Sequence, residues 1–190
     1  MREVVKRGAG SIDVREQFEA MYRRCEEPVL SYALRRAPAE VARDSVADAF
    51  VAAWRRFDEL PQDPLPWLIG ATRKTLANQR RSTARQARVA ERLAREPAGV
   101  TFPPDASADD PVVRRAFRQM SAGDREALAL VAWDGLTPTQ AARTLDCPPV
   151  AFRVRLHRAR WRLARALQQE SEVERPVVLE RVDPTAKEAS

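Results

Sequence analysis

The sequence predicts an all-α protein made of two small helical domains, and three observations lead to this fold class. Apolar residues recur at helical spacing, no stretch of useful length alternates as a strand would, and one proline-rich acidic segment interrupts the pattern. The 190 residues allow one medium domain or two small ones. Because only 6% of the residues are aromatic, small helical units are favoured over one thick core.

The N-terminal segment predicts helices with one apolar face each. A first face consists of Phe18, Met21, Tyr22 and Cys25, and a short second helix is expected after Pro28. The clearest pattern covers residues 40–57, where apolar residues from Ala42 to Phe57 form one helical stripe. The opposite face of this helix carries Asp44, Asp48, Val51 and Arg55.

A loop and a basic helix follow. Residues 58–66 contain three prolines in nine positions, which predicts a loop. A helix restarts at Trp67, and its basic character continues to about Arg95, with eight basic residues against one acidic residue over 67–95. Its polar side carries Arg73, Lys74, Asn78, Arg80 and Arg81.

The segment 96–111 separates the two predicted domains. It contains four prolines, four acidic residues and no basic residue, which is typical of a flexible linker. We therefore expect one domain over 1–95, a second over 112–170 and a flexible C-terminal tail over 171–190. Two basic segments on either side of an acidic linker indicate two contacts with one polyanion, although two solvated helix faces would give the same charges.

Residues 137–165 contain the sharpest local pattern. Thr137, Pro138 and Gln140 form a capping box with proline at the first helical position. A short helix, the turn 146–148 and a longer helix from Pro149 make a helix-turn-helix. The inner positions of the longer helix are Phe152, Leu156, Ala159 and Leu163, and its outer face presents Arg153, Val154, His157, Arg158 and Arg160. Such a face suits the major groove of DNA, whereas a solvated helical hairpin is the plainer interpretation.

Several classes of protein are poorly supported. No window approaches 18 consecutive apolar residues, and the start lacks the apolar region of a signal peptide, so we expect a cytoplasmic protein without membrane insertion. Cys25 and Cys147 lie far apart and His157 is the only histidine, which disfavours a disulfide scaffold or a metal site. No phosphate-binding loop or nucleophile with a base is present, so we expect neither an enzyme nor a cofactor.

The two halves resemble one family. The segment LTPTQAARTLDCPPVAFRVRLHRARWRLARAL, with RVRLHRAR at 153–160, resembles region 4 of extracytoplasmic-function sigma factors. Phe18, Tyr22, the helix from Asp44 to Trp54 and PWLIGATRKTLANQRR at 66–81 resemble region 2 of the same family. The resemblance implies a subunit that binds core RNA polymerase and directs promoter-specific transcription initiation. Its implied partners are core RNA polymerase and promoter DNA, and members of the family can also be held inactive by an anti-sigma factor.

The resemblance also implies a role for each predicted surface. The recognition helix would read the minus-thirty-five element through Arg153, Val154, Arg155, His157, Arg158 and Arg160. The loop and the basic helix would capture the melted minus-ten element through Leu60, Gln62, Arg73, Lys74, Asn78, Arg80 and Arg81. The polymerase clamp would contact Asp44, Asp48, Val51 and Arg55. Two alternatives remain: a stand-alone helix-turn-helix regulator, and a sigma-like decoy that binds only a partner protein.

Overall fold

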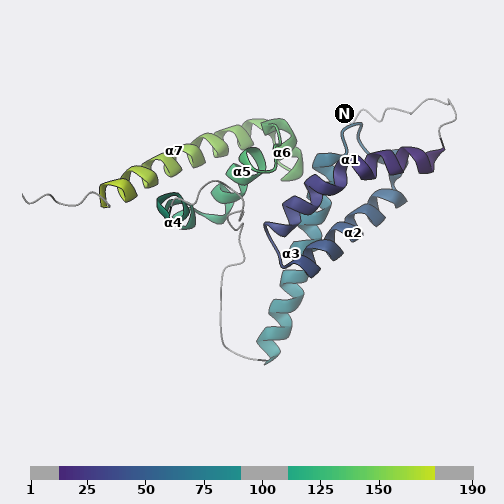
Figure 1. Cartoon of the computed structure of the whole chain (residues 1–190), viewed down its shortest axis with the longest axis horizontal. Coiled ribbons are helices and arrows are strands. Elements are labelled where there is room, and N and C mark those ends of the chain that lie inside the picture. Colours follow the sequence, from purple (N-terminus) through teal and green to yellow (C-terminus); the bar gives the residue numbers. More distant parts are fainter. Residues whose placement is uncertain (1–12, 91–110, 174–190) are drawn as a thin grey trace, which may run out of the picture.

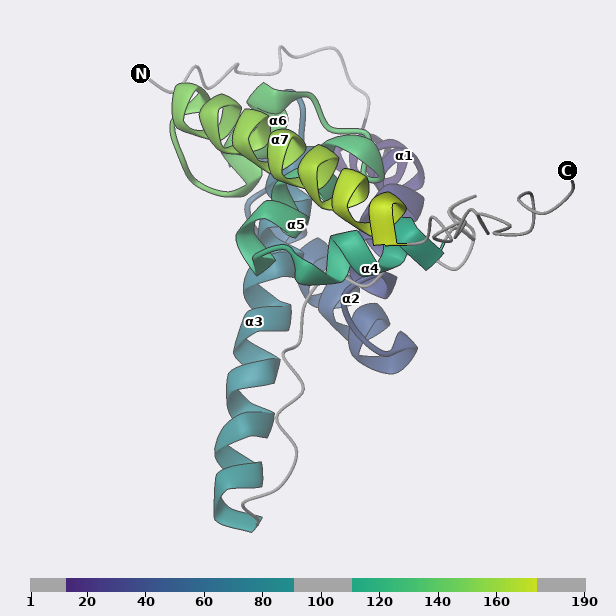
Figure 2. The same ribbon diagram turned by 90° about the vertical axis from the view of Figure 1, so that its left-hand side faces the viewer.

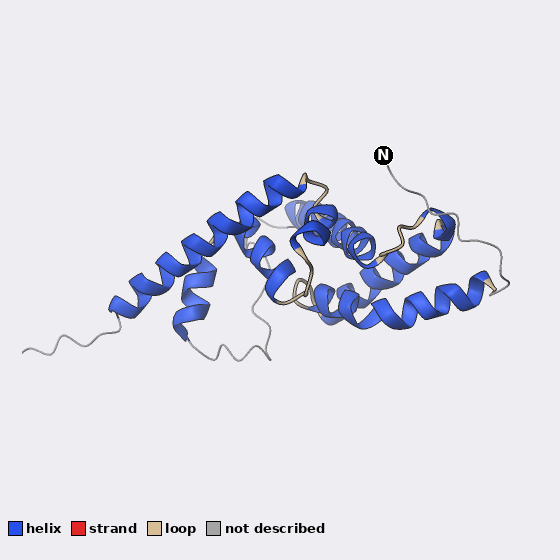
Figure 3. Ribbon diagram, turned by 90° about the horizontal axis from the view of Figure 1, so that it is seen from above, coloured by secondary structure: helices blue, strands red, loops and turns tan. Residues whose placement is uncertain are grey.

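The computed structural model describes residues 13–90 and 111–173, and over these ranges the fold is entirely helical (Figures 1 and 3). The described elements are α1 (Val14–Leu34), α2 (Ala39–Arg55), the 3-10 turn η1 (Phe57–Glu59), α3 (Leu65–Ala90), α4 (Pro111–Gln119), α5 (Ala122–Ala132), α6 (Pro138–Thr144) and α7 (Pro149–Val173). The predicted all-α class is confirmed. The predicted linker lies outside the described residues except for Pro111, and the tail does so from residue 174.

Helices α1, α2 and α3 form the N-terminal bundle, and α3 projects well beyond it (Figure 2). The inner faces of the three helices bury small and branched side chains, including Val29, Ala42, Ala53 and Leu68. The small alanines on α2 let the helices approach closely, and larger residues fill the remaining space. The apolar stripe predicted for residues 40–57 is therefore the face that packs.

Two predicted boundaries in this bundle were wrong. The predicted break at Pro28 does not occur, because α1 continues through it to Leu34. A proline inside a helix costs about 3 kcal/mol, and the burial of Val29, Tyr32 and Ala33 directly after it offsets that cost. The loop predicted over 58–66 is shorter than expected, because η1 occupies its start and α3 begins at Leu65. Pro66 fits there, since the first helical turn needs no proline N–H.

The C-terminal bundle is arranged along α7, which contacts α4, α5 and α6. Phe117 of α4 packs against Trp133 with their ring centroids 5.0 Å apart, so Trp133 closes the end of α5. Ser121 caps α5 by accepting a hydrogen bond from the Asp124 N–H at 3.1 Å. These contacts fix the platform on which the helix-turn-helix is built.

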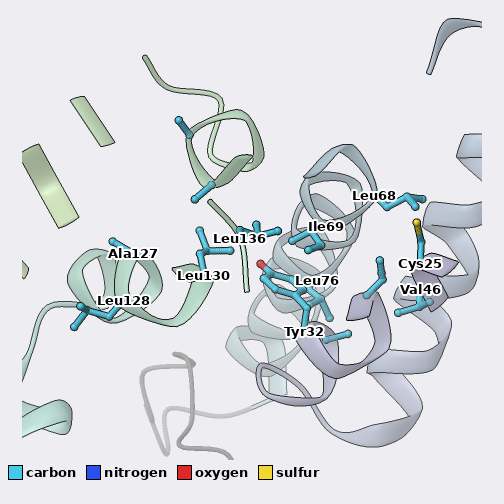
Figure 4. Close-up of a cluster of buried hydrophobic side chains, with 14 of the residues drawn as sticks. Cys25, Tyr32, Val46, Leu68, Ile69, Leu76, Ala127, Leu128, Leu130 and Leu136 are labelled. Atoms are coloured by element: carbon cyan, nitrogen blue, oxygen red, sulfur yellow. The ribbon is translucent and has the colours of Figure 1, made fainter. Parts of the chain in front are cut away.

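The two bundles also contact each other. Leu130 and Leu136 belong to the same buried cluster as Tyr32, Ile69 and Leu76, and Figure 4 shows them facing that side of the N-terminal bundle. Helix α3 contacts α6 directly. Sequence patterns alone predicted two bundles connected by a linker, whereas the structure gives them a common buried interface.

Candidate nucleic-acid interface

The first helix of the helix-turn-helix, α6, is fixed by hydrogen bonds at both of its ends. The Gln140 N–H donates to Thr137 Oγ1 at 3.3 Å and the Thr137 N–H donates to Gln140 Oε1 at 2.8 Å, which is the predicted capping box. At the other end of α6, the Cys147 N–H donates to the Ala142 carbonyl at 3.0 Å and the Asp146 N–H donates to the Arg143 carbonyl at 3.2 Å. This is a Schellman motif, in which Asp146 adopts the left-handed conformation with a φ of 53°.

Helix α7 presents its predicted outer face to solvent. Phe152, Leu156 and Ala159 are buried, as the spacing predicted. All six predicted DNA contacts on this helix are exposed, namely Arg153, Val154, Arg155, His157, Arg158 and Arg160. A helix anchored on one side with a cationic opposite side is the geometry that a major-groove reader needs.

A second basic surface lies on α3. Arg73, Lys74, Asn78 and Arg81 are exposed, and the Arg81 guanidinium donates to Asn78 Oδ1. Arg80 is half-buried because its guanidinium donates to the carbonyl oxygen of Arg36. In the loop before α3, Gln62 is exposed while Leu60 packs against the core. The structure thus leaves most of the predicted minus-ten residues exposed and turns Leu60 and Arg80 partly inward.

The outer face of α2 carries the four predicted polymerase contacts, Asp44, Asp48, Val51 and Arg55, all of them exposed. Beside this face, Trp54 packs edge-on against Phe18 with ring centroids 4.9 Å apart and still leaves about half of its surface exposed. A hollow of about 280 Å³ on α1 is lined by Phe18, Glu19, Tyr22 and Arg23. The acidic and apolar residues together give this side of the N-terminal bundle the character of a protein-binding surface.

A cluster of charged residues, Arg35, Arg36, Glu126 and Asp134, joins the two bundles. The Arg36 guanidinium donates to Glu126 at 3.1 Å and to Asp134 at 2.9 Å, and the Arg35 guanidinium donates to the other Asp134 oxygen. The Tyr32 hydroxyl donates to Glu126 at 3.2 Å, and its ring lies 3.6 Å from the Arg36 guanidinium carbon. We call this set of residues the interdomain cluster; its members are Tyr32, Arg35, Arg36, Glu126 and Asp134.

Burial shifts the protonation equilibria of two members of this cluster. Burial, then the nearby Glu126 carboxylate, raises the pKa of Tyr32 far above its usual range. Burial disfavours the charged form of Arg36, but Tyr32, Glu126 and Asp134 outweigh it and raise the pKa of the guanidinium. At neutral pH the Tyr32 phenol is therefore neutral and the Arg36 guanidinium is charged.

The loop before α3 is held by the helix-turn-helix. Gln140 Nε2 donates to Asp63 Oδ2 at 2.8 Å, and the buried Thr144 hydroxyl donates to the Pro66 carbonyl at 3.2 Å. The first helix of the helix-turn-helix thus rests against the end of the loop that was predicted to capture DNA. Helix α7 stays exposed in the same arrangement.

Comparison with known proteins identifies the C-terminal bundle. Residues 112–163 match the family model described as sigma-70, region 4, and this range covers α4 to most of α7. Over this range the sequence is similar to sigma-70, region 4. Among curated proteins, none matches the sequence closely enough to count as a relative.

Solved sigma factors have the fold of the whole described chain. The sigma factor RpoE in complex with the anti-sigma factor NepR from Bartonella quintana aligns with a TM-score of 0.62 and 23% identity, over 84% of this chain and 99% of that one. CnrH in complex with the cytosolic domain of CnrY aligns with a TM-score of 0.55 and 22% identity, over 82% of this chain and 90% of that one. The fold of these solved proteins therefore covers both bundles.

Neither a metal site nor a membrane span is found in the described part of the chain. Over residues 13–90 and 111–173, no three His, Cys, Asp or Glu side chains gather where they could hold a metal ion. None of the described helices has the length and apolar character needed to cross a bilayer.

Sequence reasoning missed the exposure of Trp54, Val150 and Trp161. Val150 and Trp161 lie on the outer face of α7, and Trp54 is exposed next to Val51 on α2. The helical spacing of Val150 and Trp161 could have predicted their exposure, because it places them on the side of the helix opposite to Phe152 and Leu156.

Proposed function

We propose that this chain is a sigma factor of the extracytoplasmic-function type, a dissociable subunit that binds core RNA polymerase and directs promoter-specific transcription initiation. The observation that carries the proposal is the region 4 match over a helix-turn-helix whose outer face is exposed and cationic. The sigma-like fold of α1 to α3 supports it, because a stand-alone regulator would leave these helices without a role.

Each surface has its own task in this proposal. Arg153, Val154, Arg155, His157, Arg158 and Arg160 contact the minus-thirty-five element. Leu60, Gln62, Arg73, Lys74, Asn78, Arg80 and Arg81 hold the melted minus-ten strand. The protein itself needs no catalytic group for melting, because binding the opened strand through bases and phosphates offsets the cost of unpairing.

The polymerase contact is assigned to the outer face of α2, with Asp44, Asp48, Val51 and Arg55. Core polymerase then holds both DNA-binding surfaces at the spacing of the promoter, so two weak contacts reinforce each other through effective concentration. The protein acts in the cytoplasm, as a DNA-binding regulator rather than an enzyme. An anti-sigma factor is a further partner, since the similar RpoE was solved with the anti-sigma factor NepR and CnrH was solved with the cytosolic domain of CnrY.

Gel filtration with bacterial core RNA polymerase tests the proposal. We expect the purified chain to co-elute with core polymerase at moderate salt, and the charge reversals Asp44→Lys and Asp48→Lys together to abolish co-elution. Arg15→Ala serves as the matched control, because Arg15 is an exposed residue of α1 whose side chain pairs with the equally solvated Glu19. A folded, monodisperse chain that fails to co-elute contradicts the proposal and favours a stand-alone regulator or a decoy.

A second measurement separates promoter reading from polymerase binding. Arg153→Ala together with Arg158→Ala removes two exposed guanidiniums from α7 without touching its buried face. We expect promoter-directed transcription to be lost while co-elution with core polymerase is retained. Loss of co-elution in this variant would contradict the division of tasks between the two bundles.

A further inference from the structure

The centre of the outer face of α7 is apolar. Phe152, Leu156, Ala159 and Leu163 define the inner side of the helix. At about 100° per residue, Val150, Val154 and Trp161 lie within about 40° of one another on the opposite side. Their exposed fractions are 68%, 45% and 59%, which are high values for such side chains. The residues that point away from the protein therefore include three large apolar side chains, with His157 beside them.

Arginines line this apolar strip on both sides. Arg153 and Arg160 lie on one side of the strip and Arg158 and Arg165 on the other, all of them exposed. Arg162 follows on the second side, where its guanidinium pairs with Asp124 at 2.6 Å. No acidic residue occurs from Pro149 to Gln169. The major groove of DNA is about 12 Å wide and is bordered by two phosphate backbones, so two cationic rows around a narrow apolar strip match its charge pattern. This complementarity points to DNA as the molecule that covers the strip.

A valine can recognise only one feature of a base edge in the major groove. Its side chain has no hydrogen-bond donor or acceptor, so it cannot distinguish guanine, adenine or cytosine through their polar atoms. The C5-methyl group of thymine is the apolar feature that the groove presents. Val150 and Val154 lie in the first two turns of α7, and the N-terminal residues of a recognition helix are the ones that contact bases.

We infer that Val150 and Val154 select thymines in the minus-thirty-five element by packing against their C5-methyl groups. This inference rests on the proposed function, because it requires α7 to enter the major groove. The two valines are separated by about 6 Å along the helix axis, which corresponds to about two base-pair steps. The selected thymines therefore lie within two or three neighbouring base pairs. Trp161 lies about 10 Å beyond Val154, past the part that reaches bases.

Replacement of thymine by uracil tests the inference, because uracil lacks only the methyl group. The complete chain is first assembled with core polymerase and used to select promoter DNA from a library randomised over the minus-thirty-five element. The selected DNA is then the probe for the binding measurement. We expect selected sequences to contain thymines in adjacent positions, and uracil at those positions to weaken binding about fourfold each, the value of one buried methyl group.

Variants of the chain identify which valine side chain contacts each thymine methyl group. Val150→Ala and Val154→Ala should each remove the uracil effect at one position and leave the other unchanged. Val14→Ala is the matched control, since Val14 is a comparably exposed valine on α1 and should keep both effects. If uracil binds as well as thymine everywhere, or the valine variants keep both effects, the inference is wrong.

Two further outcomes are distinguishable. Loss of co-elution with core polymerase in the valine variants, with no uracil effect in the unmodified chain, would make this strip a protein-binding surface and overturn the inference. Failure of the unmodified chain to co-elute with polymerase would instead overturn the proposed function.

Discussion

Removal of the Asp134 carboxylate is the most direct test of how the two bundles are held together. This side chain is 1% exposed and accepts hydrogen bonds from both Arg35 and Arg36, whose own side chains are 13% and 4% exposed. In Asp134→Ala, Arg36 keeps only Glu126 as its carboxylate partner within the interdomain cluster. The substitution therefore leaves buried positive charge that is poorly compensated.

The expected cost follows from the burial of these charges. Breaking a buried ion pair from one side costs about 3–5 kcal/mol, mostly because the remaining charge stays away from water. The two bundles can escape this cost by separating, which returns Arg35 and Arg36 to solvent. A cost of about 3 kcal/mol shifts the equilibrium between contacting and separated bundles by a factor of about 100. Separation, with the helices intact, is therefore the expected result.

Small-angle scattering and circular dichroism together measure this result. We expect Asp134→Ala to increase the radius of gyration while the helical signal in the far ultraviolet stays unchanged. Glu19→Ala is the matched control, because it breaks an exposed pair with Arg15 that is worth less than about 0.5 kcal/mol. An Asp134→Ala chain with an unchanged radius and an unchanged urea midpoint would refute the reasoning.

Three further predictions concern stability. The pKa of Tyr32 is raised in the folded state, so the neutral phenol contributes to the free energy of unfolding. This contribution is complete below about pH 10 and falls by about 1.4 kcal/mol per pH unit as the pH rises above that value. Between about pH 9 and about pH 11, the free energy of unfolding measured in urea should therefore depend less on pH in Tyr32→Phe than in the unmodified chain. Phe152→Ala should destabilise the C-terminal bundle by about 3–5 kcal/mol in thermal unfolding, since Phe152 is fully buried. Thr137→Ala should cost about 1 kcal/mol in the same measurement through loss of the cap of α6.

Local patterns could be predicted from the sequence, and long-range charge contacts could not. The capping box at Thr137 and the spacing from Phe152 to Leu163 depend on neighbours within one helix, so the helix-turn-helix was predicted correctly. Arg36 and Asp134 are 98 residues apart, and each looks like an ordinary surface charge until the fold brings them together. The interface between the bundles was therefore missed.

The difference between local and long-range contacts also explains the wrong prediction at Pro28 and the partly buried positions of Leu60 and Arg80. A proline normally ends a helix, and Pro28 does not because tertiary burial outweighs the local cost. Leu60 and Arg80 were predicted as DNA contacts from the resemblance, but the core and the Arg36 carbonyl turn them partly inward. Their contact with DNA remains a proposal.

The contact between the bundles has a consequence for how tightly this chain binds its partners. Twenty residues separate the end of α3 from the start of α4, enough for an extended chain to span at most about 70 Å. A partner that binds only separated bundles must supply the free energy that Arg36 and Asp134 contribute to the contact. Its apparent dissociation constant is therefore raised by the inverse of the separated fraction. By this linkage, a weakened interdomain cluster gives tighter binding to such a partner, with no change at the surface where it binds.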